Sequence, residues 1–181
     1  DGFVDFFGGI NDIQNKVIKA VGDPYERFNE DKLRIMRGIR FSSQLSFTIE
    51  SKTKEAIFSL KDGLKEISAE RISVELDKLL MGDNVYPVLM EYAEVLSVVI
   101  PEIKPCIDFE QKNPYHIYTV WEHIAKAVEK SSKKIEVRLS MLFHDIGKPR
   151  CFTVDEKGIG HFKGHEEISA EMAKEIMHRL R

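Results

Sequence analysis

Residues 21–41, VGDPYERFNEDKLRIMRGIRF, decide the fold, because within them the chain changes from a strand-like pattern to a helical one. Asp23 is placed as an N-cap, Pro24 stands at the first helical position and Glu26 at the third, which is a capping-box arrangement. Apolar residues then recur at helical spacing to about Leu45. The stretch therefore predicts a helix that begins near Asp23 and continues to Leu45.

One face of this predicted helix carries a carboxylate and three guanidinium groups. A helical projection places Asp31, Arg34, Arg37 and Arg40 opposite the apolar stripe, and Gly38 leaves a gap among them. One interpretation is a solvated face in which Asp31 and Arg34 form an i, i+3 ion pair.

The other interpretation is that this face reads the edge of a nucleotide base. Asp31 would accept a hydrogen bond from an amino group, and Arg34 would donate to the ring nitrogen beside it. Adenine and cytosine offer that pair of groups, whereas uracil and guanine offer the reverse polarity and would leave both side chains unpaired. Arg37 and Arg40, further round the helix, would meet phosphates.

The remaining pattern predicts a mainly α protein with a short β segment at its N-terminus. Strand character is confined to residues 3–21, around Phe3 to Phe7 and Val17 to Val21. Helices are predicted at 53–60, 68–81, 119–129, 135–146 and 166–180, with one or two more in 86–100 and a small hairpin or lid loop at 152–162. Three prolines mark a boundary at about residues 101–114.

Composition limits the function classes. The chain has 181 residues, 43% of them apolar, and a net charge of −3, so a packed core is expected and any nucleic-acid binding must come from local patches. The longest apolar run is too short to cross a bilayer, and two cysteines with no metal-type spacing suggest a reducing, cytoplasmic setting. With no initiator Met and no cap at the last helix, we expect a fragment of a larger protein.

A second group of polar residues in the last third of the chain suggests a metal site. His144 and Asp145 follow an apolar helical run, and His116 and His123 are seven residues apart, so on one helix they would share a face. Imidazole and carboxylate suit a divalent transition metal or Mg²⁺. We therefore take His123, His144 and Asp145 as candidate ligands, with His116 as the alternative to His123.

Two other histidines, His161 and His165, are four residues apart and could join this site. We favour a simpler interpretation, in which His161 lies in a surface loop and His165 starts a helix. The basic stretch around 126–138, with Lys126, Lys130, Lys133, Lys134 and Arg138, could contact RNA, but a solvated cluster at a helix end is the favoured interpretation.

Three stretches form recognisable motifs: D-x-F-G-G-x-x-D at 5–12, V-G-D-P-x-x-R-F-x-E-D-x-L-R-x-x-R-x-x-R-F at 21–41 and A-E-R-I-x-x-E-L-x-K-L-L at 69–80. Together they resemble the CCA-adding tRNA nucleotidyltransferases and bacterial poly(A) polymerases of the bacterial (class II) type. The resemblance implies a nucleotidyltransferase that adds CMP and AMP to the 3′ end of tRNA or another RNA, with ATP and CTP selected by Asp31 and Arg34. It also places Arg37 and Arg40 at nucleotide-binding positions. Glu70, Arg71 and Glu75 fall on a motif that braces the neck, so we expect a structural role for them.

The resemblance implies three parts. Residues 1–22 would be the C-terminal remnant of a head domain, 23–105 a helical neck and body for nucleotide selection and RNA binding, and 106–181 an HD-type domain, truncated at its end. The family's head domain holds Mg²⁺ with two aspartates one residue apart, and no Asp-x-Asp occurs in the 181 residues. We therefore expect no catalytic residue for nucleotide addition in this chain.

The C-terminal part resembles the HD phosphohydrolase superfamily, through R-L-x-x-L-x-H-D-I-G-K-P at 138–149 and G-x-G-H-F-x-G-H-x-x-x-S-A at 158–170. That superfamily uses a later aspartate as a further ligand, and after Asp145 only Asp155 remains. The favoured expectation is a vestigial or incomplete metal site, and a metal-dependent hydrolase of 2′,3′-cyclic phosphates or phosphomonoesters is the alternative. Family resemblance does not distinguish CCA addition from poly(A) addition.

Overall fold

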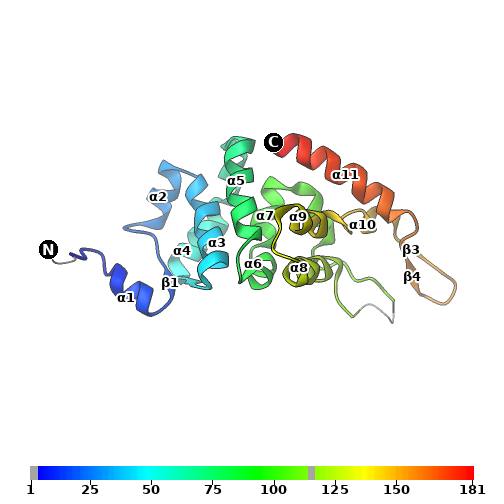
Figure 1. Ribbon diagram of the computed structural model, residues 1–181, viewed down its shortest axis with the longest axis horizontal. Coiled ribbons are helices and arrows are strands. Elements are labelled where there is room, and N and C mark those ends of the chain that lie inside the picture. Colours follow the sequence, from blue (N-terminus) through cyan, green and yellow to red (C-terminus); the bar gives the residue numbers. More distant parts are fainter. Residues whose placement is uncertain (1–3, 114–116) are drawn as a thin grey trace.

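A computed structural model describes residues 4–113 and 117–181 (Figure 1). The first half contains α1 (Gly9–Gln14), β1 (Val17–Ile18), α2 (Pro24–Glu30), α3 (Leu33–Leu45), β2 (Thr48–Ile49), α4 (Ser51–Leu60), the 3₁₀ helix η1 (Lys61–Glu66) and α5 (Ala69–Leu80). The second contains α6 (Val85–Glu91), α7 (Ala93–Val99), the 3₁₀ helix η2 (Pro101–Cys106), α8 (Val120–Lys130), α9 (Ile135–Phe143), α10 (Lys148–Cys151), β3 (Thr153–Val154), β4 (Gly160–His161) and α11 (His165–Leu180). The prediction of a mainly α fold is confirmed.

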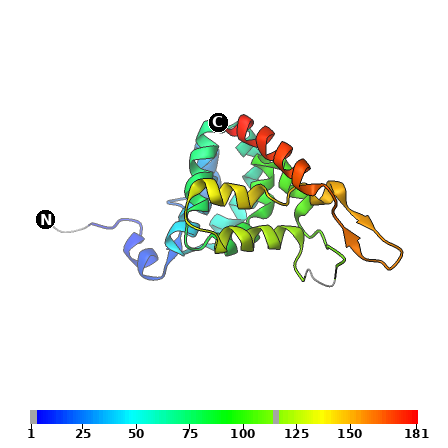
Figure 2. The same cartoon turned by 45° about the vertical axis from the view of Figure 1, so that its right-hand side comes forward.

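The molecule is elongated, with the N-terminal segment and the β3–β4 hairpin at opposite ends of its long axis (Figure 1). Helices α8, α9 and α11 are stacked one above another (Figure 2). The C-terminal end of α11 contacts α5, so this helix lies against the first half of the chain. Among the described residues, no helix is both long and apolar enough to span a bilayer.

The β segment is smaller than the sequence predicts. β1 pairs in parallel with β2, Val17 opposite Thr48 and Ile18 opposite Ile49, but residues 4–7 form no strand and Phe3 lies outside the described residues. The Asp5 carboxylate instead accepts hydrogen bonds from the backbone N–H groups at the start of α1, at 3.0 Å from Gly9 and 2.8 Å from Ile10. A capping carboxylate therefore favours a turn where the aromatic pattern predicted a strand.

The predicted continuous helix over 23–45 is wrong in one respect, since it divides at Asp31. The Asp23 carboxylate caps α2 by accepting from Tyr25 and Glu26, as expected. Asp31 then adopts an extended conformation, with φ −149° and ψ 103°. Its Oδ1 accepts the Leu33 N–H at 3.1 Å, which satisfies an amide at the start of α3.

Helices α3 and α5 form the centre of the first half. The buried face of α3 presents Ile35, Met36 and Ile39, each fully inaccessible to solvent. Burial of each such side chain stabilises the fold by roughly 1.5–3 kcal/mol. The turn after α5 approaches α3 closely at Gly82, where a Cβ atom would lie 2.5 Å from the Ser43 backbone carbonyl. Only glycine therefore permits this contact.

In the second half, Thr119 caps α8 by accepting the Glu122 N–H at 3.2 Å, at the position where the sequence predicts that a helix begins. Helix α9 ends at Phe143, three residues before the predicted end, and four turn residues follow it. Pro149 lies in the first turn of α10. Proline fits there because the first turn of a helix does not need its N–H. The predicted hairpin is present as antiparallel β3 and β4.

Candidate functional site

Three predicted metal ligands converge where α8 meets the turn that follows α9. His123 comes from α8, and His144 and Asp145 come from the turn. His144 Nε2 lies 3.3 Å from His123 Nε2, and each of these nitrogens lies 3.3 Å from Asp145 Oδ2. Among the described residues, these three form a group whose ligand atoms all lie within 4.8 Å of one another.

The hydrogen bond of His144 fixes which of its nitrogens can bind a cation. His144 Nδ1 lies 2.7 Å from the Met141 carbonyl oxygen. A carbonyl oxygen only accepts, so Nδ1 carries the proton in the neutral ring. The lone pair of Nε2 then points toward His123 and Asp145. A backbone carbonyl that orients the ring in this way is typical of histidines that bind metals.

The triangle of donor atoms has the dimensions of a small cation site. A tetrahedral ion with bonds of about 2.0–2.1 Å separates its ligands by about 3.3–3.4 Å. The three 3.3 Å separations match that value. Two imidazoles and one carboxylate are also a donor set that divalent transition metals accept. The residues present therefore fit a divalent cation.

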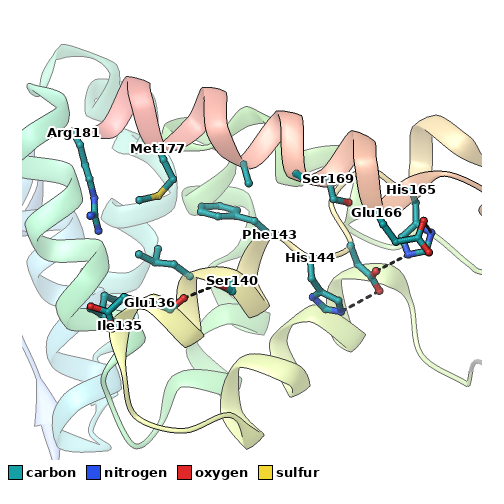
Figure 3. Close-up of a pocket in the computed structure, with 14 residues that line it drawn as sticks. Ile135, Glu136, Ser140, Phe143, His144, His165, Glu166, Ser169, Met177 and Arg181 are labelled. Carbon is teal, nitrogen blue, oxygen red and sulfur yellow. Dashed lines mark hydrogen bonds and ion pairs between the residues drawn. The ribbon is translucent and has the colours of Figure 1, made fainter.

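Asp145 is almost fully buried and has two further partners that sequence reasoning did not assign to it. Lys148 Nζ lies 2.8 Å from Oδ2, and His165 Nε2 lies 3.2 Å from Oδ1 (Figure 3 shows the His165 contact). Burial alone would raise the pKa of Asp145, but the hydrogen bonds that His144 (when its ring is protonated) and Lys148 donate outweigh it and lower the pKa well below its ordinary value. Asp145 is therefore a carboxylate.

The i, i+3 spacing could have indicated the contact between Lys148 and Asp145, because the two residues lie three positions apart in a turn. It contained none for Gln111, whose Oε1 accepts from Lys148 at 2.9 Å, because Gln111 comes from a loop far away in sequence. His165 starts α11, as interpreted from the sequence, but its ring also reaches Asp145. The His165 ring is only 20% exposed, so this residue both starts the helix and belongs to the cluster around Asp145.

The other predicted candidates lie elsewhere. Asp155 is in the β3–β4 hairpin, where its carboxylate pairs with His161 at 2.9 Å, and both side chains are exposed. It also accepts from the backbone N–H groups of Lys157 and Ile159, so it organises the hairpin loop. His116 lies outside the described residues.

A cavity of about 640 Å³ opens beside this cluster, between α9 and α11. His144, Asp145 and His165 lie at one end of it and Arg181 at the other, with largely apolar side chains such as Phe143 between them (Figure 3).

The predicted base-reading residues occupy a second region, at the junction of α2 and α3. Asp31 and Arg34 do not pair with each other. Arg34 Nη1 lies 2.7 Å from Glu30 Oε2 and donates to the Arg27 carbonyl oxygen at 3.0 Å. Asp31 is approached instead by Arg71 of α5, whose Nη2 lies 3.4 Å from Oδ2. The i, i+3 ion pair is therefore absent.

A cavity of about 560 Å³ lies beside these residues, between β1, α2 and α3. Three guanidinium groups line it, from Arg27, Arg34 and Arg37, and Gly38 forms part of its wall. Arg37 is exposed and makes no ion pair or hydrogen bond within the described part of the chain. The cavity is therefore suited to an anionic ligand with an apolar part, since Phe28 and Phe41 also line it.

Arg40 is placed differently from the other arginines. Its Nε lies 2.7 Å from Glu75 Oε2 of α5, with side chains only 12% and 10% exposed, and its guanidinium stacks on Phe41 at 3.8 Å. Arg40 does not line the cavity between β1, α2 and α3. Its contacts link α3 to α5.

The basic stretch at 126–138 is not a continuous surface patch. Arg138 is buried, and its guanidinium donates to the carbonyl oxygens of Leu80 and Gly82 at the end of α5. Lys133 pairs with Asp83, and the Lys126 ammonium lies over the rings of Tyr86 and Tyr118. These partners support the interpretation of a helix-end cluster.

The chain is similar to known proteins over most of its length. Residues 46–107 match a family described as the probable RNA and SrmB-binding site of polymerase A, and residues 115–181 match the HD domain. The CCA-adding enzyme of Enterococcus faecalis is 54% identical over 81 residues, which cover 45% of this chain and 20% of that enzyme. The CCA-adding enzyme of Leuconostoc mesenteroides is 41% identical over 139 residues, covering 72% of this chain and 34% of that enzyme.

A solved structure extends the match to nearly the whole chain. The CCA-adding enzyme of Bacillus stearothermophilus, solved in complex with CTP, superimposes with a TM-score of 0.59 and 26% identity, covering 98% of this chain and 40% of that one. The chain belongs to the CCA-adding enzyme and poly(A) polymerase family. It matches both of these family models, and it spans about a fifth to a third of the length of the curated relatives named above.

Proposed function

We propose that the protein containing this chain adds CMP and AMP to the 3′ end of tRNA, and that this chain supplies nucleotide selection. The observation that carries the proposal is the cavity lined by Arg27, Arg34 and Arg37, because it offers positive charge for phosphates, and Arg34 lies one helical turn after the partly exposed carboxylate of Asp31. The relatives named above are CCA-adding enzymes, and one was solved with CTP. No Asp-x-Asp occurs in these 181 residues, so in this proposal the carboxylates for phosphoryl transfer come from another part of the protein.

In this proposal Asp31 accepts from the amino group of adenine or cytosine, and Arg34 donates to the neighbouring ring nitrogen. Both residues are partly exposed, with side chains 30% and 40% accessible, so a base can reach them. Arg37, which makes no ion pair or hydrogen bond within the described residues, binds phosphate. Arg40 acts on nucleotide binding through its ion pair with Glu75, which holds α3 in place.

The test is nucleotide selectivity in the full-length protein. Asp31→Asn keeps an oxygen that can accept the Leu33 N–H but removes a carboxylate oxygen, so the capped turn is preserved. We expect discrimination, measured as kcat/KM for CTP or ATP divided by kcat/KM for UTP or GTP, to fall by at least about tenfold. Uracil and guanine would no longer leave the Asp31 carboxylate unpaired, so the wrong bases would no longer be penalised. Asp62→Ala is the matched control, since Asp62 is exposed and, among the described residues, pairs only with Lys65. Unchanged selectivity in Asp31→Asn would refute the base-reading role.

We also propose that His123, His144 and Asp145 bind a divalent metal ion, Mg²⁺ or a transition metal, in the HD region. When bound, such an ion would supply a Lewis acid and an anchor for phosphate oxygens. The chain's own residues prepare the site: the Met141 carbonyl orients His144, and Lys148 and His165 hold the two oxygens of Asp145. Metal content after dialysis against each ion, measured by mass spectrometry, tests this proposal.

A further inference from the structure

A smaller cavity, of about 390 Å³, lies where the β3–β4 hairpin meets the starts of α10 and α11. Four of the side chains that line it are basic, and among the described residues none of the lining side chains is acidic. The basic ones are Lys148, His161, Lys163 and His165. The chain as a whole has 30 acidic residues against 27 lysines and arginines, so this concentration of basic groups departs from its average. The cavity therefore offers positive charge and N–H donors, which suit an oxyanion.

The hairpin strand that forms one wall of this cavity is fixed to the rest of the protein. The Gly160 N–H donates to the Lys112 carbonyl oxygen at 2.7 Å, and Asn113 Nδ2 donates to the Gly160 carbonyl oxygen at 3.3 Å. A Cβ atom at Gly160 would overlap the Gln111 carbonyl oxygen, so only glycine permits this close approach. Aromatic rings pack together beside the strand, from Phe109, Phe152 and Phe162. The wall is therefore formed before any ligand arrives, which lowers the entropic cost of binding.

Two carboxylates hold the basic side chains without lining the cavity themselves. Asp145 lies 2.8 Å from Lys148 Nζ and 3.2 Å from His165 Nε2. Asp155 Oδ2 lies 2.9 Å from His161 Nε2. Neither Asp145 nor Asp155 is part of the cavity lining, so a ligand there meets the basic groups and not the acids that hold them.

Lys163 differs from the other three basic residues because its charge has no partner in the fold. It lies in the turn between β4 and α11, it is exposed, and it makes no ion pair or hydrogen bond within the described part of the chain. Its three N–H donors are therefore available to a ligand. The cavity is also larger than a phosphate group, and the Phe162 ring forms part of its wall, so a sugar fits beside the anion.

We propose that this cavity binds a phosphate group of a nucleotide, free or within an RNA strand, with Lys163 as its main cationic contact. The choice of phosphate among anions rests on the proposed function, since nucleotides and RNA 3′ ends are the anions that such a protein meets. His165 lines both this cavity and the one between α9 and α11, so the bound phosphate lies beside the candidate metal centre. None of the three predicted metal ligands lines the cavity, so binding is expected without a metal ion.

The experiment measures binding to the full-length protein in the presence of a metal chelator. The probes are a short fluorescent oligoadenylate RNA, followed by anisotropy, and ribose 5-phosphate, which carries no base, followed by calorimetry. Lys163→Ala is compared with Lys157→Ala, because Lys157 is an exposed lysine of the same hairpin that does not line the cavity.

We expect Lys163→Ala to weaken RNA binding roughly fivefold, the size expected of an exposed charge pair. The slope of log affinity against log salt concentration should also become shallower by about 0.7, the value for one phosphate contact on a single strand. Lys157→Ala should change neither quantity.

The two probes show where the phosphate comes from. If Lys163→Ala weakens binding of both probes, a single phosphate group is enough for the site, and if it weakens only RNA binding, the site takes a phosphodiester within a strand. Either result supports the proposal. Unchanged binding of both probes by Lys163→Ala would overturn it, and so would an equal loss in Lys157→Ala, which would show only a general effect of charge.

The proposed function is tested separately by the nucleotide selectivity of Asp31→Asn. If that selectivity is unchanged while Lys163→Ala loses affinity for the probes, base reading is lost and the phosphate site stands. If Asp31→Asn loses selectivity and Lys163→Ala binds both probes normally, base reading stands and the phosphate site is lost.

Discussion

Arg40 Nε lies 2.7 Å from Glu75 Oε2 across the contact between α3 and α5, and both side chains are nearly buried. The Arg40 guanidinium also stacks on Phe41 and donates to Gln44, so it is held on several sides. This pair fixes the position of α3, the helix that carries Arg34 and Arg37, against α5.

Removal of the acidic partner should destabilise the fold strongly. We expect Glu75→Ala to lower the free energy of unfolding by about 3 kcal/mol, because it leaves a nearly buried guanidinium without a counter-charge. Urea denaturation of the chain measures the loss. Replacing both residues together, Glu75→Leu with Arg40→Met, should cost less than Glu75→Ala. A midpoint for Glu75→Ala equal to that of the exposed Lys78→Ala would contradict this prediction.

The metal proposal predicts a selective effect of histidine replacement. His123→Ala and His144→Ala should each weaken binding of the divalent ion by at least about a hundredfold, because loss of even an outer partner of a ligand costs 10–100-fold. Isothermal titration with each metal measures the change. His178→Ala, an exposed histidine of α11, is the control. Equal metal binding by all three variants would show that these rings are not ligands.

Metal binding should also depend on pH. Burial lowers the pKa of His144, but its hydrogen bond with Asp145 and the charge of Asp145 raise it, and the net pKa lies above 6.5. A metal needs the unprotonated Nε2, so affinity should fall as the pH drops through that raised pKa. Titrations between about pH 5.5 and 8.5 test this, and a flat profile would contradict it.

Without metal, stability should respond to pH in the opposite direction. A folded-state pKa of His144 that is raised above its unfolded value contributes stability below the unfolded pKa, and this contribution is lost as the pH rises through the folded pKa. In the presence of a metal chelator, the melting temperature of the wild-type protein should therefore fall, relative to that of His144→Ala, as the pH rises from about 5.5 to 8.5. Identical pH dependence of the two proteins would show that His144 does not contribute.

The sequence predicted most of the helices because their signals are local. The N-caps Asp23 and Thr119 and the spacing of apolar residues on α5 act within a few residues of chain. The break at Asp31 was missed because one side chain competes with the backbone there, which periodicity does not reveal. The three candidate ligands came from residue type and spacing, whereas Gln111 and Arg71 reach their partners across 37 and 40 residues, which no local pattern encodes.

Gly147 should be intolerant of even one added methyl group. A Cβ atom there would lie 2.8 Å from Ser169 N and 2.9 Å from the His165 carbonyl oxygen, both backbone atoms of α11. Alanine would therefore push α11 away from the turn that carries His144 and Asp145. We expect Gly147→Ala to cost about 1–3 kcal/mol of stability, the usual cost of overpacking, and to weaken metal binding as well, because His165 moves with α11.

Ser169→Ala separates the two effects: it removes the acceptor of the buried Gly147 N–H without adding bulk, so it should cost stability while leaving α11 in place. Thermal unfolding and metal titration of both variants are the measurements. A Gly147→Ala protein as stable as the wild type would mean that α11 does not pack against this turn as closely as the structure places it.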